Sequence, residues 1–254
     1  YEIGVRLVGS EMCIRDSRGA SDLTVAGKLF CDRFPPDKIP ALPTCGIFLR
    51  REFPLKNNLE FPEGIHPCED GLFSHFVLAL TEKISFCPEA VYHYRQHEQG
   101  NHHQIRKRTA DILPMIPRWL SLIEEFYEQR HLWKRKAGHL VRFIEHEPFE
   151  LRLLGMPFSP PEQEILYSII RDFLNAHCTA AECRRASLHL PFRLLLKSSG
   201  FSDFGRRLRR AGKNTGIRRK LLHFCPVPSW RRNGRARLRQ VREQLEEIRR
   251  NITF

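Results

Sequence analysis

The chain has few of the features that would assign it to a class at once. It contains no run of about 18 or more apolar residues, so the sequence predicts no membrane-spanning helix. Its eight cysteines form no CxxC motif and match no zinc-site spacing. Its start has no basic-then-apolar pattern of a signal peptide. The scattered cysteines and the missing signal together favour a reducing, cytoplasmic setting.

Charge is unevenly distributed along the 254 residues. Residues 184–254 contain 20 Lys and Arg against 4 Asp and Glu, a balance of +16, whereas residues 1–183 have a balance of −3. A basic C-terminal segment favours an anionic partner, either an acidic membrane surface or a nucleic acid. A solvated charged face would explain the same composition without a partner.

The first residues of the chain resemble a sequence that does not come from a natural gene. Residues 8–17, VGSEMCIRDS, resemble one translated reading frame of a transposon-end adapter used in sequencing libraries, and the match is unbroken from Gly9 to Asp16. We therefore expect residues 1–17 to be non-native, and the native chain to start near residue 18. An ordinary short strand and turn is the alternative.

Two long segments show the spacing of amphipathic helices. In residues 110–129 the apolar face comprises Ile112, Ile116, Trp119, Ile123 and Phe126. In residues 160–177 it comprises Ile165, Ile169, Ile170 and Phe173, with Pro161 at the first helical position and Glu162 in the first turn. Residues 235–250 have the pattern of a shorter amphipathic helix.

The region before residue 105 has a mixed pattern. Residues 45–53 predict a short strand that leads into a helical turn, and residues 83–88 and 90–96 predict two further short strands. Between them, residues 69–83 predict a helix whose apolar stripe comprises Leu72, Phe73, Phe76, Val77 and Leu80. This alternation of strand and helix suggests a mixed fold.

Glu69 and Asp70 stand side by side immediately before that apolar stripe. Carboxylates are favourable in the first turn of a helix, because they meet unpaired N–H groups and the positive end of the helix dipole. A structural role therefore explains the pair. A chemical role is the alternative, in which one carboxylate is a general base that points into a cleft.

The order of motifs over residues 45–104 resembles the second half of the catalytic domain of family 2 glycosyltransferases, which are inverting enzymes of GT-A fold. The matching residues are Phe48, Arg50, Arg51 and Phe53, then the turn Phe61-Pro62-Glu63-Gly64, then Glu69 and Asp70 before the apolar helix, then Ile84–Pro88, and finally Tyr92, Tyr94 and Arg95. The resemblance implies an α/β (or α+β) fragment, with an incomplete GT-A half over residues 18–104. A mainly α-helical extension over 105–183 and a basic, mainly helical tail over 184–254 would follow.

By this resemblance, Asp70 is the general base. It would take the proton from a hydroxyl of a glycan or lipid-linked acceptor while that oxygen attacks the anomeric carbon of a nucleotide-sugar donor. Glu69 would shape the pocket, or would be a simple first-turn charge. Arg95 would bind the donor phosphates, or would be a surface residue at a strand end. His97 would assist at the metal–diphosphate unit, or would be an exposed loop histidine.

A complete enzyme of this family would also hold a divalent metal, Mg or Mn, through an Asp-x-Asp motif. No two aspartates of this chain have that spacing, and no glycine-rich phosphate loop follows a predicted strand. The adapter-like start would explain both absences if the donor-binding half was lost with the upstream gene. We therefore expect the parent protein to be an enzyme and this chain alone to be inactive.

A competing hypothesis assigns the function to the basic tail. The chain would then be a noncatalytic protein that binds a nucleic acid or an anionic surface through residues 184–254. Nucleic acid is the less favoured partner, because the tail has no recognised module and no regular alternation of aromatic and basic residues. An anionic membrane would place the protein at the periphery of the cytoplasmic face, and it is compatible with the enzyme hypothesis.

Overall fold

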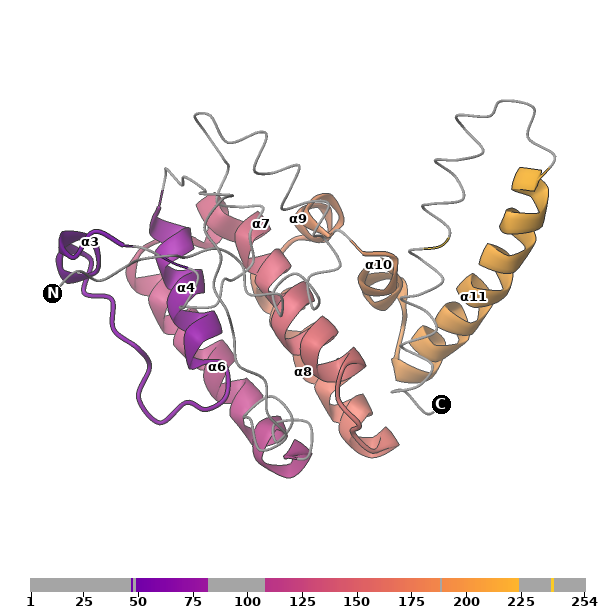
Figure 1. Cartoon of the computed structure of the whole chain (residues 1–254), viewed down its shortest axis with the longest axis horizontal. Helices are drawn as coiled ribbons and strands as arrows, with labels where there is room; N and C mark the ends of the chain where they lie inside the picture. Colours follow the sequence, from indigo (N-terminus) through magenta and orange to yellow (C-terminus); the bar gives the residue numbers. More distant parts are fainter. Residues whose placement is uncertain (1–46, 48, 82–107, 188, 224–238, 240–254) are drawn as a thin grey trace, which may run out of the picture. The chain divides into compact units, whose positions relative to one another are not determined.

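The computed structural model describes residues 47, 49–81, 108–187, 189–223 and 239 (Figure 1). The chain divides into two compact units, Tyr1–Phe143 and Ile144–Phe254. In the described residues of the first unit the elements are α3 (Glu52–Lys56), α4 (Glu69–Leu80), α6 (Thr109–Gln129) and α7 (Trp133–Ile144), which ends at the boundary. In the second they are the π-helix η3 (Glu145–Leu154), α8 (Pro160–His177), α9 (Ala180–Ala186), α10 (Leu190–Lys197) and α11 (Phe201–His223).

The predicted α/β or α+β fold class is wrong for the part of the chain that the structure describes. That part is mainly helical and contains no strand. Residues 47 and 49–51 form no strand, whereas the helical turn expected at the end of residues 45–53 is present as helix α3, which begins at Glu52. The strands predicted for residues 83–88 and 90–96 lie outside the described residues. The physical reason is that the described apolar side chains recur every three or four residues, and this period buries one face of a helix rather than one face of a strand.

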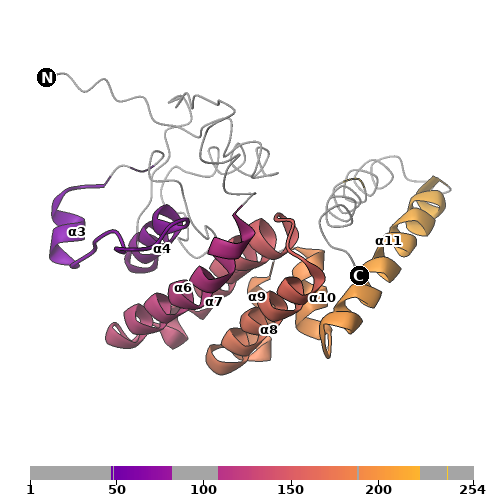
Figure 2. The ribbon, with the colours of Figure 1, turned by 90° about the horizontal axis from the view of Figure 1, so that it is seen from below.

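Helix α4 is buried on all of its faces. Every residue from Gly71 to Ala79 is buried, so the predicted apolar stripe is only part of the buried surface. Helix α6 packs beside α4, as both views show (Figure 1 and Figure 2). Phe76 of α4 stacks on Phe126 of α6 with ring centroids 4.2 Å apart. Full burial of such a side chain contributes about 1.5–3 kcal/mol, so α4 and α6 form a central part of the first core.

Two buried histidines extend this core to α7. The His75 ring stacks on His139 with centroids 4.2 Å apart, and it lies 4.4 Å from the ring of Phe143. A hydrogen bond of 3.2 Å joins the Tyr127 hydroxyl to Nε2 of His75. Both histidines are completely buried. The three helices α4, α6 and α7 therefore share one aromatic cluster, which holds α4 in place behind its N-terminal carboxylates.

The predicted helix over 110–129 is confirmed. Helix α6 spans Thr109–Gln129 and buries all five side chains of the predicted stripe. Pro114 and Pro117 lie inside the helix, on its exposed side. Their rings remove backbone donors there, but solvent can hydrate the carbonyl oxygens that lose a partner.

The predicted helix over 160–177 is confirmed, and its predicted apolar face is confirmed in part, since Ile170 and Phe173 are buried and Ile169 is half-buried. Ile165 is 51% exposed, whereas the buried side chains are those of Gln163, Leu166, Tyr167, Ile170, Phe173 and Leu174. The helix begins at Pro160, as the predicted range has it, so Pro160 rather than Pro161 occupies the first helical position, and Ser159 and Glu162 form a capping box at this start. The Ser159 N–H donates to Oε2 of Glu162 over 2.7 Å, which confirms Glu162 in the first turn.

The second unit places η3 against α8, and α10 and α11 against each other. The edge of the Phe149 ring meets Phe192 at 5.1 Å, and Phe204 lies 5.8 Å from Tyr167. In η3, a buried ion pair joins Arg152 to Glu147 at 3.1 Å. The Glu145 carboxylate accepts the His189 N–H over 2.7 Å. Charged side chains are therefore buried in this core with partners, as burial of charge requires.

His146 of η3 makes the stability of the second unit depend on pH. Burial lowers the pKa of His146, and the positive charge of Arg152 lowers it further. The hydrogen bond to Glu150 and the negative charges of Glu147 and Glu150 outweigh these effects, so the pKa is raised above 6.5. Protonated His146 is thus favoured by folding. We expect its contribution to be complete below about pH 6.5 and to disappear as the pH rises through the folded-state value.

Urea unfolding at about pH 6 and about pH 8.5 measures this contribution. The free energy of unfolding of the wild type should fall more over this interval than that of the variant His146→Gln. His131→Gln is the matched control, because it makes the same substitution at an exposed histidine of the chain. An identical pH dependence in the wild type and in His146→Gln would contradict the assignment.

Candidate functional site

The segment before α4 is fixed against the helix by a turn of unusual backbone conformation. Phe61 stacks on Phe73 of α4, with centroids 4.1 Å apart and planes at 11°. Gly64 has φ +67° and Cys68, which immediately precedes α4, has φ +91°. Positive φ is easy for glycine and uncommon for other residues. The turn therefore has a defined shape, and it delivers the two carboxylates to the start of a buried helix.

Glu69 and Asp70 have different surroundings in the first turn of α4. Nδ1 of His66 lies 3.1 Å from Oε1 of Glu69, which holds the Glu69 carboxylate back against the turn. Asp70 is exposed. Negative charge is favourable at both positions because of the helix dipole. Of the two, Asp70 is the more exposed carboxylate, and Glu69 is half-buried.

A groove lies beside this turn, within the same unit. It has a volume of about 310 Å³ and is lined by Glu63 and Ile65 of the turn and by Pro117, Arg118, Ser121, Leu122 and Glu125 of α6. The turn approaches α6 closely, since a Cβ added at Gly64 would lie 3.7 Å from the Arg118 guanidinium. Carboxylate, guanidinium and hydroxyl groups in one groove suit a ligand rich in hydroxyls.

The α6 side of this groove was missed from the sequence. Ser121 and Leu122 lie three and four residues after Arg118, and Glu125 lies four and three residues after them, which places all four on one stripe of α6. That spacing could have been recognised in the sequence. The groove could not be predicted from the sequence, because it depends on where the turn packs against α6.

The other predicted site residues are placed as follows. Arg95 and His97 lie outside the described residues, so their roles stay predictions. Arg50 and Arg51 are exposed just before α3. In the part of the chain that the structure describes, no three His, Cys, Asp or Glu side chains are grouped as metal ligands would be. The divalent metal therefore stays an expectation for the complete enzyme.

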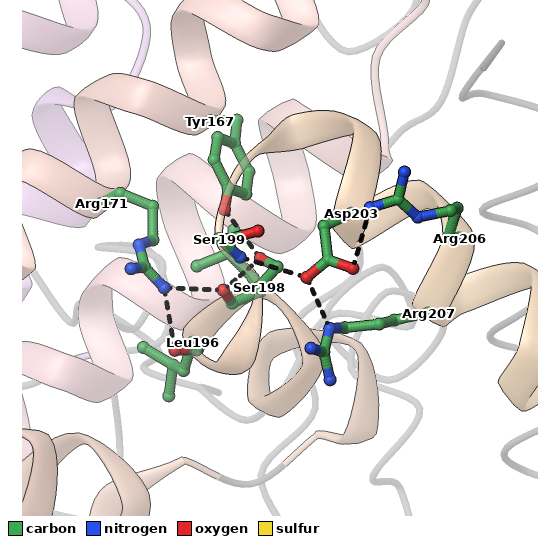
Figure 3. Close-up of polar contacts among 9 residues, drawn as sticks. Tyr167, Arg171, Leu196, Ser198, Ser199, Asp203, Arg206 and Arg207 are labelled. Carbon is green, nitrogen blue, oxygen red and sulfur yellow. Dashed lines mark hydrogen bonds and ion pairs between the residues drawn. The ribbon is translucent and has the colours of Figure 1, made fainter.

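Part of the basic tail has a structural role (Figure 3). Asp203 of α11 accepts hydrogen bonds from Arg207 Nε over 2.7 Å and from the Ser199 N–H over 3.1 Å, and Arg206 lies 3.4 Å away. The hydrogen bond from Arg207, followed by that from Ser199, lowers the pKa of Asp203 to about 2. These contacts fix the start of α11, so Arg206 and Arg207 are partly explained without a partner.

A second polar cluster in the same view fixes the end of α10 on α8. Nη1 of Arg171 donates to the carbonyl oxygens of Leu195 and Leu196 over 2.9 Å and 2.8 Å. The Ser198 hydroxyl donates to Leu195 over 2.6 Å, which leaves its oxygen to accept from Tyr167 over 2.7 Å. Since each of these polar atoms has a partner in the fold, the cluster is a packing feature rather than a ligand site.

We found no family model that matches the chain, and no match to it among curated proteins or solved structures. The helices of the described part include none that is both long and apolar enough to cross a membrane.

Proposed function

We propose that the chain is part of an inverting glycosyltransferase in which Asp70 is the general base. The observation that carries the proposal is the exposed Asp70 carboxylate in the first turn of a helix in which every residue from Gly71 to Ala79 is buried. The ordered motifs around it support the same function. The enzyme would transfer a sugar from a nucleotide-sugar donor to a hydroxyl of a glycan or a lipid-linked acceptor.

The chemistry assigned to Asp70 is the removal of one proton. A carboxylate oxygen of Asp70 would accept the proton of the acceptor hydroxyl as that oxygen attacks the anomeric carbon. A rigid base is more effective than a mobile one, because the reacting atoms are then already placed. The buried residues of α4 and the Phe61–Phe73 stack supply that rigidity.

Glu69 and the groove have supporting roles in this proposal. Glu69 is held by His66, so it would orient the turn and the acceptor rather than accept the proton. Glu63, Glu125 and Arg118 line the groove and would hydrogen-bond acceptor hydroxyls. The divalent metal would be bound by the Asp-x-Asp motif expected of the complete enzyme, which this chain does not contain, and the donor diphosphate would be bound with the help of Arg95 and His97, which lie outside the described residues.

The test combines sequencing with an activity assay. Long reads of the source DNA across the codons for residues 1–30 should show the adapter-like codons to be absent from the genome, and an open frame with an Asp-x-Asp motif should continue upstream. The product of that complete gene should then transfer sugar from one member of a panel of labelled nucleotide sugars. A genome that encodes VGSEMCIRDS after a nearby start codon, or a complete product inactive with every donor, would contradict the proposal.

Helix α11 favours a second candidate function, the binding of an anionic membrane surface. Its buried face contains Phe201, Phe204 and Leu208. Arg206, Arg209 and Arg210 are exposed, so the helix presents positive charge along a side that the core does not use. Basic residues near an anionic leaflet contribute about 1 kcal/mol each. This function is compatible with an enzyme whose acceptor is linked to lipid.

Removal of two of these charges should weaken membrane binding. We expect Arg209→Ala with Arg210→Ala to lower the affinity for phosphatidylcholine vesicles that contain phosphatidylserine by about 30-fold, which corresponds to about 2 kcal/mol. Co-sedimentation of the protein with these vesicles at low salt measures the affinity. The matched control is Lys134→Ala with Arg135→Ala, which removes the same charge from exposed positions of α7. Equal weakening by both double variants would show that net charge alone is responsible.

A further inference from the structure

The groove between α6 and the turn that precedes α4 contains an arginine whose charge no neighbour neutralises. Arg118 lines this groove and is exposed. Among the described residues its guanidinium forms no ion pair, and its one hydrogen bond runs from Nη1 to Sδ of Met115 over 3.8 Å. A thioether is a weak acceptor, whereas a guanidinium carries five N–H donors. Most of the donors of Arg118 are therefore available to a ligand in the groove.

The turn leaves one side of the Arg118 guanidinium uncovered. It approaches Nη2 of Arg118 at Gly64, where the backbone has φ +67° and an added Cβ would lie 3.7 Å from that nitrogen. A side chain at this position would cover part of the guanidinium, and the positive φ would be strained in any other residue. The stack of Phe61 on Phe73 and the burial of Ile65 fix the turn in this place. The groove is therefore shaped by packing before a ligand enters.

The remaining groups of the groove suit a sugar ring. Glu63, Ser121 and Glu125 offer oxygen atoms that accept hydrogen bonds from hydroxyl groups. Ile65 and Leu122 offer apolar surface for the C–H face of a ring. The volume of about 310 Å³ lies at the lower end of the range of ligand pockets, about 300–1,000 Å³. The groove therefore suits a short piece of a glycan rather than a long one.

The charges of the groove favour a ligand with a single negative charge at Arg118. Glu125 lies seven residues after Arg118 on α6, which is about 10 Å along the helix axis. Charges that far apart are screened strongly by salt, so Glu125 opposes an anion on Arg118 only weakly. Glu63 belongs to the turn and opposes it more. A carboxylate therefore suits the groove better than a phosphate monoester, which carries about −1.5 to −2 at pH 7.

We propose that this groove binds a hexuronate residue, with the sugar carboxylate on Arg118 and the ring hydroxyls on the other polar groups. The planar fork of a guanidinium matches the two oxygens of a carboxylate, and such charge-assisted hydrogen bonds are about twice as strong as neutral ones. The inference rests on the proposed function only in calling this sugar the acceptor. It then names the acceptor class, which is an acidic glycan, and it assigns to Arg118 a carboxylate in place of a hydroxyl.

Ligand-observed NMR on the folded full chain at low salt tests this ligand class. The probes are the methyl glycosides of glucuronate and galacturonate, their methyl esters, and the 6-phosphates of the corresponding methyl hexosides, which share a ring and differ at C6. We expect a hexuronate probe to bind the wild type about 10-fold more tightly than its neutral ester, because the ester loses the charge-assisted pair. No measurable binding of either hexuronate, or equal affinity for acid and ester, would overturn the proposal.

Two substitutions show whether this preference belongs to Arg118. In Arg118→Gln the acid and the ester should bind equally. Arg135→Gln removes the same charge from an exposed position of α7 and should keep the preference. A preference that survives Arg118→Gln, or that both variants reduce equally, would place the anion elsewhere on this basic chain and overturn the proposal. Tighter binding of the 6-phosphates than of the hexuronates would overturn the carboxylate as the bound group.

The binding measurement is independent of the chemistry assigned to Asp70. Asp70→Asn should bind the probes as the wild type does, because Asp70 does not line the groove. Absence of binding would therefore overturn the acidic acceptor and leave the general base standing. A complete enzyme that is inactive with every donor would overturn the transferase, whereas hexuronate binding that depends on Arg118 would still assign the ligand of the groove.

Discussion

Replacing Asp70 by Asn should lower sugar transfer by the complete enzyme about 10²- to 10⁴-fold, the usual contribution of a general base. The amide has nearly the same shape and hydrogen-bonding reach as the carboxylate, but it cannot accept the hydroxyl proton. Because Asp70 is exposed, the substitution should leave the fold intact. The measurement is kcat and KM for a labelled nucleotide sugar, and the loss should fall mainly on kcat.

Asp111 is the matched control for this experiment. It is also an exposed carboxylate in the first turn of a helix, where it pairs with Arg108 at 2.7 Å. If Asp70 is only a first-turn charge, Asp70→Asn and Asp111→Asn should each change stability by less than about 1 kcal/mol and leave transfer unchanged. Glu69→Gln should weaken transfer less than Asp70→Asn, since Glu69 is held by His66. A larger loss in Glu69→Gln would make Glu69 the base.

The second large effect is expected in the core of the second unit. Leu166→Ala should reduce the free energy of unfolding by about 2–5 kcal/mol, because the Leu166 side chain is completely buried and its removal leaves a cavity. Urea unfolding measures the loss. The neighbouring substitution Ile165→Ala should cost less than about 1 kcal/mol, since this side chain is 51% exposed.

These neighbouring positions separate two interpretations of α8. The apolar pattern of the sequence placed Ile165 on the buried face, and the fold places Leu166 there instead. Both substitutions leave alanine in the same helix, so helix propensity affects them nearly equally. If Ile165→Ala lost as much stability as Leu166→Ala, or more, the result would indicate that Ile165 lies on the buried face of α8, as the sequence predicted.

The difference at α8 has a clear physical cause. Residues 165–170 include apolar side chains on more than one side of the helix, and several stripes are compatible with such a pattern. The capping box of Ser159 and Glu162 sets where α8 begins, but not which side meets its neighbours. The sequence pattern does not assign Tyr167 to a buried or an exposed face. In the structure Tyr167 contacts Ser198 and Phe201, and these contacts fix the rotation of α8 about its own axis.

Local sequence rules determined much about this protein without help from the tertiary structure. The stripe of α6, the extent of α8 and the first-turn position of Glu69 and Asp70 all follow from side-chain spacing and from capping chemistry, which act within one helix. The concentration of positive charge after residue 183 is likewise a property of the sequence alone.

Only the tertiary structure decided the features that depend on distant residues. For the described residues the predicted fold class was wrong, because it was taken from an ordered set of short motifs, whereas the apolar side chains of these residues have the spacing of packed helices. The restraint of Glu69 by His66 and the groove beside α6 depend on the path of a turn. Such contacts arise from the packing of elements against each other, which the spacing within one element does not encode.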